Sequence, residues 1–227
     1  MIGRFALVCL DMAGTTVRDD GAVDAAFARA LETVALTPDA PRYAEVRRFV
    51  HETMGWSKSD VFAALLPPLD AARATTAFAA AYETMVAAGE VQPIEGAAAV
   101  LHTLRERDTL ICLTTGFAPS TRDALLTSLG WTALVDLALS PADVGGRGRP
   151  APDLILGAMA QLGIADPAAV AVVGDTVSDL EAGTAAHAGA VIGVLSGAHD
   201  HATLGGAPHT ALLPSVGHLI KELERAV

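Results

Sequence analysis

The sequence predicts an α/β fold, a doubly wound parallel sheet with an inserted all-helical segment. Short apolar runs alternate with helical stretches along most of the chain, which is typical of a parallel sheet covered by helices on both faces. The alternation is interrupted between residues 20 and 94, where the sequence contains no convincing strand. A chain of 227 residues has room for a sheet-containing core and a smaller insert.

The expected strands are continuous apolar runs, as in parallel strands that helices bury on both faces. The clearest runs cover residues 5–10, 109–113, 169–173 and 190–195, and weaker ones cover residues 134–139 and 209–213. Helices are expected around and between these strands at residues 96–107, 120–129, 153–162 and 179–188.

Residues 20–94 are expected to form a helical cap over the carboxyl edge of the sheet. Helices are predicted in this segment at residues 23–33, 43–51, 58–65 and 71–88, with breaks at Pro67-Pro68 and near Gly89. The predicted organisation is therefore an α/β core of residues 1–19 and 95–227 and a cap of residues 20–94.

Composition and charge argue against several classes of function. Hydrophobic residues make up 52% of the chain and charged residues 18%, which provides enough apolar material for a full core and argues against disorder. A net charge of −11 argues against a nucleic-acid partner, which would require a basic patch. The same acidity would repel an anionic substrate unless local cations or a metal reverse the field.

The cysteines and the first residues predict a cytoplasmic protein. Cys9 and Cys112 each lie in an apolar run, so we expect buried thiols rather than a disulfide or a metal site. Residues 1–10 lack the basic start and the cleavage site of a signal peptide. No stretch reaches the ~18 uninterrupted apolar residues of a membrane helix, so no membrane partner is expected.

Four polar elements are expected at the carboxyl edge of the sheet. They are Asp11, the turn Thr114-Thr115-Gly116, Arg149, and the segment from Gly174 to Asp179. Any one of them alone could be an ordinary helix cap. Two acidic clusters, a hydroxyl pair and one cation at the same edge together predict a phosphoryl-transfer site with a divalent metal.

The carboxylates suit nucleophilic attack and metal binding. Asp11 can attack phosphorus and form an aspartyl-phosphate. Asp11 and Asp175, with a backbone carbonyl near Ala13, offer the oxygen ligands that Mg²⁺ prefers. Asp179 lies one helical turn after Asp175 and could orient a metal-bound water.

The remaining polar groups suit an anion. The hydroxyls of Thr114 or Thr115, with nearby backbone N–H groups, can bind phosphoryl oxygens at a helix start. Arg149 would neutralise negative charge on Asp11 and on the phosphoryl group, with two donors in a planar fork. These groups explain how an acidic chain could hold an anion.

These motifs resemble those of the haloacid dehalogenase superfamily, and most closely those of the phosphonoacetaldehyde hydrolases (phosphonatases) and phosphonatase-like hydrolases. Asp-Met-Ala-Gly-Thr-Thr-Val at residues 11–17 is similar to the family's first motif, in which Ala13 replaces a second aspartate that protonates the leaving oxygen in related phosphatases. Arg149 stands where most of the superfamily carries lysine and phosphonatases carry arginine. The resemblance implies a Rossmann-like core, Mg²⁺ and a phosphonate substrate, with substrate-binding positions at Thr15, Met54, Thr114, Thr115 and Gly116.

The expected cap supplies a lysine. Residues 54–60, Met-Gly-Trp-Ser-Lys-Ser-Asp, resemble the family's Met-Gly-x-x-Lys-x-Asp segment, whose lysine forms a Schiff base with the substrate aldehyde. Without that pattern, Lys58 would be interpreted as a solvated lysine at a helix start. Cleavage of a carbon–phosphorus bond leaves electrons on carbon, and an iminium at Lys58 could accept them, so that no acid is needed at Ala13. Burial or a nearby cation would have to lower the pKa of Lys58.

Several positions depart from the family pattern. Val61 stands where phosphonatases carry a histidine thought to assist proton transfer, and Phe117 replaces a tyrosine. His51 is expected at the surface, and His199 and His201 are expected in a solvated loop. These differences favour the phosphonatase-like branch.

The sequence thus predicts a Mg²⁺-dependent hydrolase that cleaves the carbon–phosphorus bond of phosphonoacetaldehyde or a close 2-oxoalkyl phosphonate, with Asp11, Lys58 and Arg149 as catalytic residues. Two alternatives stay open. One is a phosphate-ester phosphatase that uses Lys58 only for binding, and the other is a binding module with an inactive core, against which the intact Asp175 and Asp179 argue. The resemblance also implies a homodimer formed through the cap helices.

Overall fold

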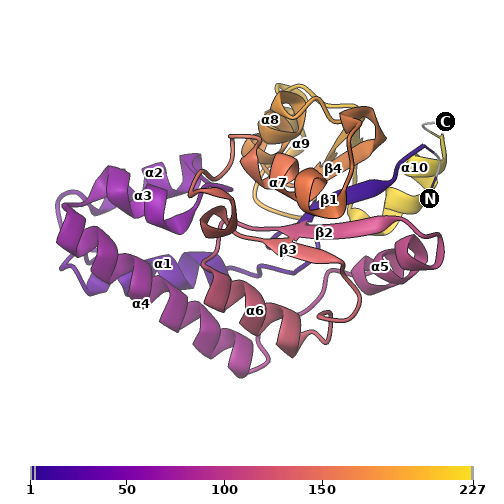
Figure 1. Ribbon diagram of the computed structural model, residues 1–227. Coiled ribbons are helices and arrows are strands. Elements are labelled where there is room, and N and C mark those ends of the chain that lie inside the picture. Colours follow the sequence, from indigo (N-terminus) through magenta and orange to yellow (C-terminus); the bar gives the residue numbers. More distant parts are fainter. Residues whose placement is uncertain (1, 3, 226–227) are drawn as a thin grey trace.

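A computed structural model describes residues 2 and 4–225 and contains a six-stranded sheet in the order β3-β2-β1-β4-β5-β6 (Figure 1). Every pairing between neighbouring strands is parallel. This architecture confirms the predicted doubly wound α/β fold. The strands are β1 (Leu7–Asp11), β2 (Leu110–Thr114), β3 (Leu137–Leu139), β4 (Val170–Gly174), β5 (Ala190–Val194) and β6 (Ala211–Leu213).

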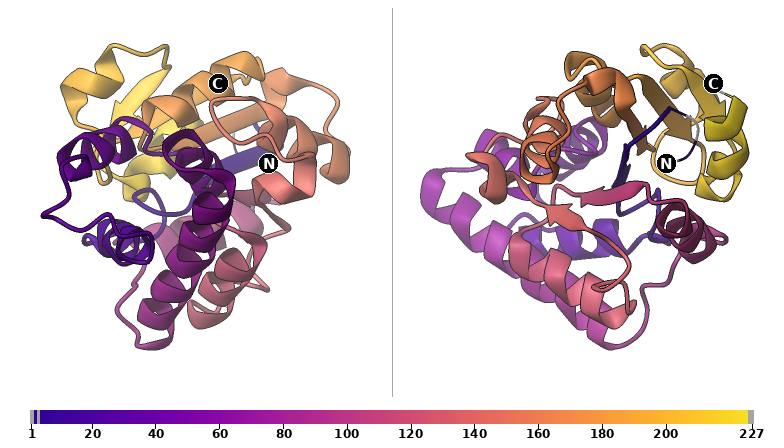
Figure 2. Two further views of the ribbon diagram at one scale, coloured as in Figure 1. Left: turned by 90° about the vertical axis from the view of Figure 1, so that its left-hand side faces the viewer. Right: turned by 45° about the vertical axis from the view of Figure 1, so that its right-hand side comes forward.

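Four helices follow β1 and precede the rest of the sheet: α1 (Ala22–Glu32), α2 (Tyr43–Glu52), α3 (Lys58–Leu65) and α4 (Pro68–Ala87). They lie beyond the carboxyl ends of the strands, at the left of Figure 1 and towards the viewer in the left view of Figure 2. We call α1–α4 the helical insert. The helices that follow are α5 (Ala97–Glu106), α6 (Pro119–Ser128), α7 (Asp153–Leu162), α8 (Val177–Ala185), α9 (His201–Gly205) and α10 (Leu219–Arg225).

Helices cover both faces of the sheet. Successive side chains of each strand point to opposite faces, so each face contributes its own side chains to the core. Leu7 and Cys9 of β1 pack with α7 and α8, whereas Val8 and Leu10 belong to the cluster that includes α5. Cys9 lies opposite Cys112 in the register of β1 and β2, and both thiols are free and buried. The expectation of two buried thiols is therefore confirmed.

The insert has an aromatic centre. The ring of Phe27 on α1 lies 5.3 Å from that of Phe62 on α3 and 4.8 Å from that of Phe78 on α4. Tyr82 on α4 reaches across to the core, where its ring lies 4.6 Å from that of Phe117. These aromatic contacts connect the insert to the turn that follows β2.

Element boundaries differ from the sequence predictions by a few residues, for local reasons. The helix expected at residues 71–88 begins already at Pro68, because proline is well tolerated at a first helical position that needs no N–H donor. The helix expected at residues 179–188 begins at Val177, because Thr176 caps it. Helices α9 and α10 were not expected; the side chain of Asp200 caps α9 through the N–H of Thr203.

No helix among residues 2 and 4–225 combines the length and the apolar character required to cross a lipid bilayer. The division at residues 19/20 and 94/95 and the homodimer stay predictions.

We expect Leu101→Ala to lower the free energy of unfolding by about 2–5 kcal/mol, because Leu101 on α5 is fully buried against the sheet and its loss leaves a cavity. The matched control is Leu69→Ala on α4, where the leucine is 84% exposed and the change should stay within about 0.5 kcal/mol. Urea denaturation measures both, and equal effects would contradict the described core.

Candidate active site

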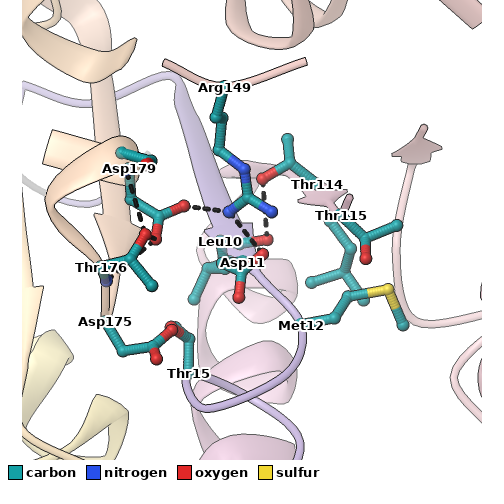
Figure 3. A network of polar contacts seen from close by, with 12 residues as sticks. Leu10, Asp11, Met12, Thr15, Thr114, Thr115, Arg149, Asp175, Thr176 and Asp179 are labelled. Carbon is teal, nitrogen blue, oxygen red and sulfur yellow. Dashed lines mark hydrogen bonds and ion pairs between the residues drawn. The ribbon is translucent and has the colours of Figure 1, made fainter. Parts of the chain in front are cut away.

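Three polar segments meet where neighbouring strands end. Strand β1 ends at Asp11, β2 ends at Thr114 and β4 ends at Gly174, and β1 lies between the other two. The carboxyl ends of parallel strands share one edge of the sheet, so the side chains that follow them converge (Figure 3).

Arg149 lies between two carboxylates. Its Nη1 donates to Oδ1 of Asp11 at 2.6 Å and also to Oδ1 of Asp179. All three side chains are buried. The Nε of Arg149 is buried and has no hydrogen-bond partner in the described part of the chain, so one donor is left for a bound acceptor. The predicted neutralisation of Asp11 by Arg149 is therefore present in the geometry.

Asp179 is fixed by the start of α8. Its Oδ2 accepts hydrogen bonds from the N–H and the hydroxyl of Thr176, at 3.0 and 2.5 Å. The hydroxyl of Thr176 in turn accepts from the N–H of Asp179, which completes a capping box. A Cβ at Gly174 would lie 2.2 Å from that of Asp179, so the last residue of β4 must be glycine.

Asp175 has hydrogen-bond partners but no cation. Its Oδ1 accepts from the hydroxyl of Thr15 at 2.9 Å, and its Oδ2 accepts from the N–H of Ala198 at 2.7 Å. No ion pair to Asp175 exists among residues 2 and 4–225. Gly14 adopts a φ of +90°, and a Cβ there would come within 2.3 Å of Oδ2. Burial, with Asp11 nearby, raises the pKa of Asp175 well above its usual range.

The three carboxylates fit a divalent metal ion. Oxygen atoms of Asp11, Asp175 and Asp179 all lie within 4.8 Å of one another. Arg149 pairs with two of them and leaves Asp175 without a cation. A hard cation that prefers oxygen ligands, such as Mg²⁺, matches both this donor set and the remaining negative charge.

Asp11, the nucleophile expected from the sequence, has a strongly shifted pKa. Burial raises the pKa of Asp11 to about 6, against the opposing effect of Arg149. The buried Asp179 carboxylate contributes in the same direction as burial. Asp11 therefore depends on cationic neighbours to stay ionised at neutral pH.

Close contacts of the backbone around Lys58 place this residue in the site. It is the first residue of α3, which Ser57 caps, and its N–H donates to the carbonyl of Gly116 at 3.1 Å. A Cβ at Gly116 would lie 2.4 Å from the carbonyl oxygen of Trp56. A Cβ at Gly55, whose φ is +90°, would lie 2.4 Å from Oγ1 of Thr176. Only glycine at both positions lets the segment before α3 rest on the core this closely.

Three aromatic rings lie around the amine of Lys58. Nζ lies 5.4, 5.8 and 5.6 Å from the ring centres of Phe27, Phe78 and Phe117. Within the described residues it makes no hydrogen bond or ion pair. Burial, assisted by the positive charge of Arg149, lowers the pKa of Lys58 to about 8. The interpretation of Lys58 as a solvated lysine is wrong.

One cavity of about 50 Å³ contains most of the expected site. The predicted residues that line it are Asp11, Ala13, Met54, Lys58, Thr115, Gly116, Arg149 and Asp175. Two others turn their hydroxyls to protein partners: Thr15 donates to Asp175, and Thr114 donates to the carbonyl of Leu10 at 3.5 Å. The hydroxyls of Thr15 and Thr114 therefore bind neighbouring protein groups and do not face the cavity.

The cavity also contains Asp19, which the sequence analysis did not single out. Asp19 accepts a hydrogen bond from the N–H of Val23 at 2.8 Å, and burial raises its pKa. It faces the same cavity as Lys58. A carboxylate four residues before a buried helix position resembles an ordinary cap, so no sequence signal distinguished it.

The histidines contribute differently from one another. His51 is exposed, as expected. His199, expected in a solvated loop, is half-buried instead, and its Nδ1 accepts from the N–H of Val177 at 3.0 Å. Neither belongs to a cluster of metal-ligating side chains in the described part of the structure.

The family model for haloacid dehalogenase-like hydrolases matches residues 5–187. The chain belongs to this family of hydrolases. A search of curated proteins finds no match.

Solved structures share the fold over nearly the whole chain. A phosphonoacetaldehyde hydrolase-like protein from Oleispira antarctica is similar, with a TM-score of 0.82 at 21% identity over 99% of this chain and 94% of that one. A predicted phosphoglycolate phosphatase from Haemophilus somnus 129pt has a TM-score of 0.81 at 16% identity over 98% and 99%. A family hydrolase from Deinococcus radiodurans R1, solved with phosphate and sodium, has a TM-score of 0.70 at 26% identity over 99% and 97%.

We expect Lys58→Met to raise the free energy of unfolding at pH 7 by about 3 kcal/mol. Below pH 8 the lysine is charged in both states, and the folded state disfavours that charge because it is buried. Between pH 8 and 10.5 the unfolded lysine binds more protons than the folded one, so the wild type gains stability and the difference shrinks.

Lys221 offers a matched control, because Lys58 and Lys221 are the only lysines in the sequence and Lys221 is exposed. Urea denaturation of wild type, Lys58→Met and Lys221→Met across this pH range measures the effect. A stabilisation that is absent, or equal at pH 7 and pH 10, would contradict a buried ammonium group.

Proposed function

We propose that this hydrolase cleaves the carbon–phosphorus bond of phosphonoacetaldehyde or a close 2-oxoalkyl phosphonate. The observation that carries the proposal is that one cavity contains Lys58, whose amine is buried and easily deprotonated, together with Asp11 and Ala13. An amine of this kind can form an imine with a carbonyl, whereas Ala13 cannot protonate a leaving oxygen.

The proposed order begins at Lys58. Its neutral amine adds to the substrate carbonyl, loss of water gives an imine, and uptake of one proton converts the imine into an iminium. A carboxylate oxygen of Asp11 then attacks phosphorus. The carbon–phosphorus bond breaks, and its electron pair forms the carbon–carbon double bond of an enamine while the iminium nitrogen becomes neutral. Protonation of the enamine carbon and addition of water to both covalent links release the carbonyl product, phosphate and the free enzyme.

Arg149 holds the phosphonate and the nucleophile together. Its guanidinium already pairs with Asp11 at 2.6 Å, and its unpartnered Nε is a further buried donor. Charge-assisted hydrogen bonds of this kind would orient the phosphonate and stabilise negative charge as it moves onto oxygen. Thr115 and Gly116 line the same cavity.

Asp11, Asp175 and the carbonyl of Ala13 would hold Mg²⁺, with Asp179 fixing its surroundings. The bound ion would neutralise negative charge on the phosphonate and on Asp11. The carboxylate of Asp175 suits this role because it is already oriented by Thr15 and Ala198 and lacks a cation of its own.

Asp19 is the proposed proton carrier near Lys58. The histidine expected of phosphonatases is replaced by Val61, and Asp19 is a carboxylate in the cavity that also contains the amine. Its raised pKa makes both protonation states accessible closer to neutral pH.

A phosphate-ester phosphatase is the second candidate, and the resemblance to a predicted phosphoglycolate phosphatase favours it. In that case Lys58 would bind the substrate as a cation and form no covalent link. The phosphonoacetaldehyde hydrolase-like relative supports the first candidate.

We expect sodium borohydride to trap phosphonoacetaldehyde covalently on Lys58, because reduction converts an imine into a stable secondary amine. Peptide mass mapping is simple, since Lys221 is the only other lysine. Lys58→Arg should abolish both trapping and phosphate release, whereas Lys221→Arg should leave both unchanged. Phosphate release from 4-nitrophenyl phosphate without any trapping would support the phosphatase instead.

The rate of trapping should increase with pH, because imine formation requires the neutral amine. With a pKa of about 8, the neutral fraction of Lys58 increases about fivefold from pH 7 to pH 8 and levels off about one pH unit later. A rate that is still increasing steeply at pH 10 would assign the reaction to an ordinary exposed amine.

We expect Mg²⁺ alone to bind the substrate-free protein in isothermal titration calorimetry and to raise its melting temperature. Asp175→Asn should weaken binding at least tenfold, because it removes the carboxylate that has no protein cation. Asp39→Asn, at an exposed position, is the control and should bind as the wild type does. Unchanged affinity in Asp175→Asn would exclude this metal site.

A further inference from the structure

A second cavity adjoins the first at Lys58. It measures about 150 Å³, against about 50 Å³ for the first. Both cavities are lined by Lys58, Gly116 and Phe117, so the two cavities meet at these three residues. The proposed reaction uses only the first cavity and leaves the larger one without a role.

The two cavities differ in charge. The first contains Asp11, Asp19, Arg149 and Asp175. The second has no charged lining residue except Lys58 itself, and its walls are the ring of Phe78, small apolar side chains of α4 and α6, and the hydroxyls of Ser57, Thr75 and Thr121. An uncharged, mainly apolar group suits the second cavity, and a phosphonate suits the first.

An imine carbon can place two groups in two compartments. The carbon bonded to Nζ of Lys58 carries two substituents, which diverge from each other. One is the CH₂–phosphonate arm, which must reach Asp11 in the first cavity. The other diverges from this arm, and the second cavity, which Lys58 also lines, is the adjoining space that can receive it. In phosphonoacetaldehyde that second substituent is a hydrogen atom, which would leave about 150 Å³ unused.

We propose that the substrates of this enzyme are 2-oxoalkyl phosphonates that are ketones, with the alkyl substituent of the carbonyl bound in the cavity between α3, α4 and α6. This inference rests on the proposed Schiff base at Lys58 and names the class of carbonyl compound that the site accepts. Cleavage follows the same steps as for the aldehyde and releases a methyl ketone and phosphate, because the enamine carbon that left phosphorus takes up one proton to become a methyl group.

The test compares phosphonoacetaldehyde with 2-oxopropyl-, 2-oxobutyl- and 2-oxopentylphosphonate in phosphate release and in borohydride trapping. Aldehydes form imines more readily than ketones do, so the informative comparison lies within the ketones. There kcat/KM should increase roughly fourfold for each added methylene group, because each one buries more apolar surface. Trapping should attach each ketone to Lys58.

Ala79→Leu narrows the second cavity from α4, and Ala80→Leu is its matched control. Ala79 lines the cavity, whereas Ala80 is the next residue of the same helix and is exposed to solvent. In Ala79→Leu the ratio of kcat/KM for 2-oxopentylphosphonate to that for phosphonoacetaldehyde should fall at least tenfold, because the added side chain occupies the space of the alkyl group. Ala80→Leu should behave as the wild type with every substrate.

Each other outcome overturns the proposal in a distinguishable way. If phosphonoacetaldehyde reacts and kcat/KM falls with each added methylene group, the ketone class is wrong while the Schiff base stands. If Ala79→Leu lowers kcat/KM equally for all compounds, the second cavity is an entrance and not a binding site. If no compound is trapped or cleaved, the proposed function fails as well.

Discussion

In the candidate active site the buried carboxyl groups outnumber the cations that pair with them. Asp11, Asp175 and Asp179 are buried within a few ångströms of one another, and Arg149 pairs with two of them. Buried charges are stable only when they are paired, hydrogen-bonded or neutralised by a metal. Arg149, the capping box at Thr176 and the hydrogen bonds to Asp175 each relieve part of the imbalance. What remains is the carboxyl group of Asp175, which has no protein cation among the described residues, next to the strand end where the nucleophile lies.

The same burial shifts the acid and the amine in opposite directions. It raises the pKa of Asp11 to about 6 and lowers that of Lys58 to about 8, because low polarity disfavours the charged form of each. The rings of Phe27 and Phe78 from the insert and of Phe117 from the core surround Nζ of Lys58, which makes no ion pair within the described residues. A nucleophilic amine and a nucleophilic carboxylate can therefore share one cavity, and the charge of Arg149 favours the reactive form of both.

The sequence was sufficient for the elements whose position depends on local pattern. Apolar runs predicted the strands, and residues just after strand ends were expected together because parallel strands end at a common edge. Asp19, the hydroxyl direction of Thr15 and the second cavity could not be predicted. Each depends on which side chains of the insert and the core come close together. A single amino-acid sequence does not give the distances between residues far apart along the chain. The burial of Lys58 was inferable only from the resemblance, since a lysine at a helix start is ordinarily solvated.

The backbone contacts at Gly116 have a consequence for divergence among related enzymes. Where two segments meet through main-chain atoms, the position of one relative to the other does not depend on which side chains are present nearby. The backbone position of Lys58 therefore depends little on substitutions elsewhere in the insert. Thr75 and Ala79 on α4, which line the larger cavity, can change without altering the backbone position of Lys58. Single substitutions in the larger cavity can therefore change the range of substrates while Asp11 and Lys58 keep their positions relative to each other.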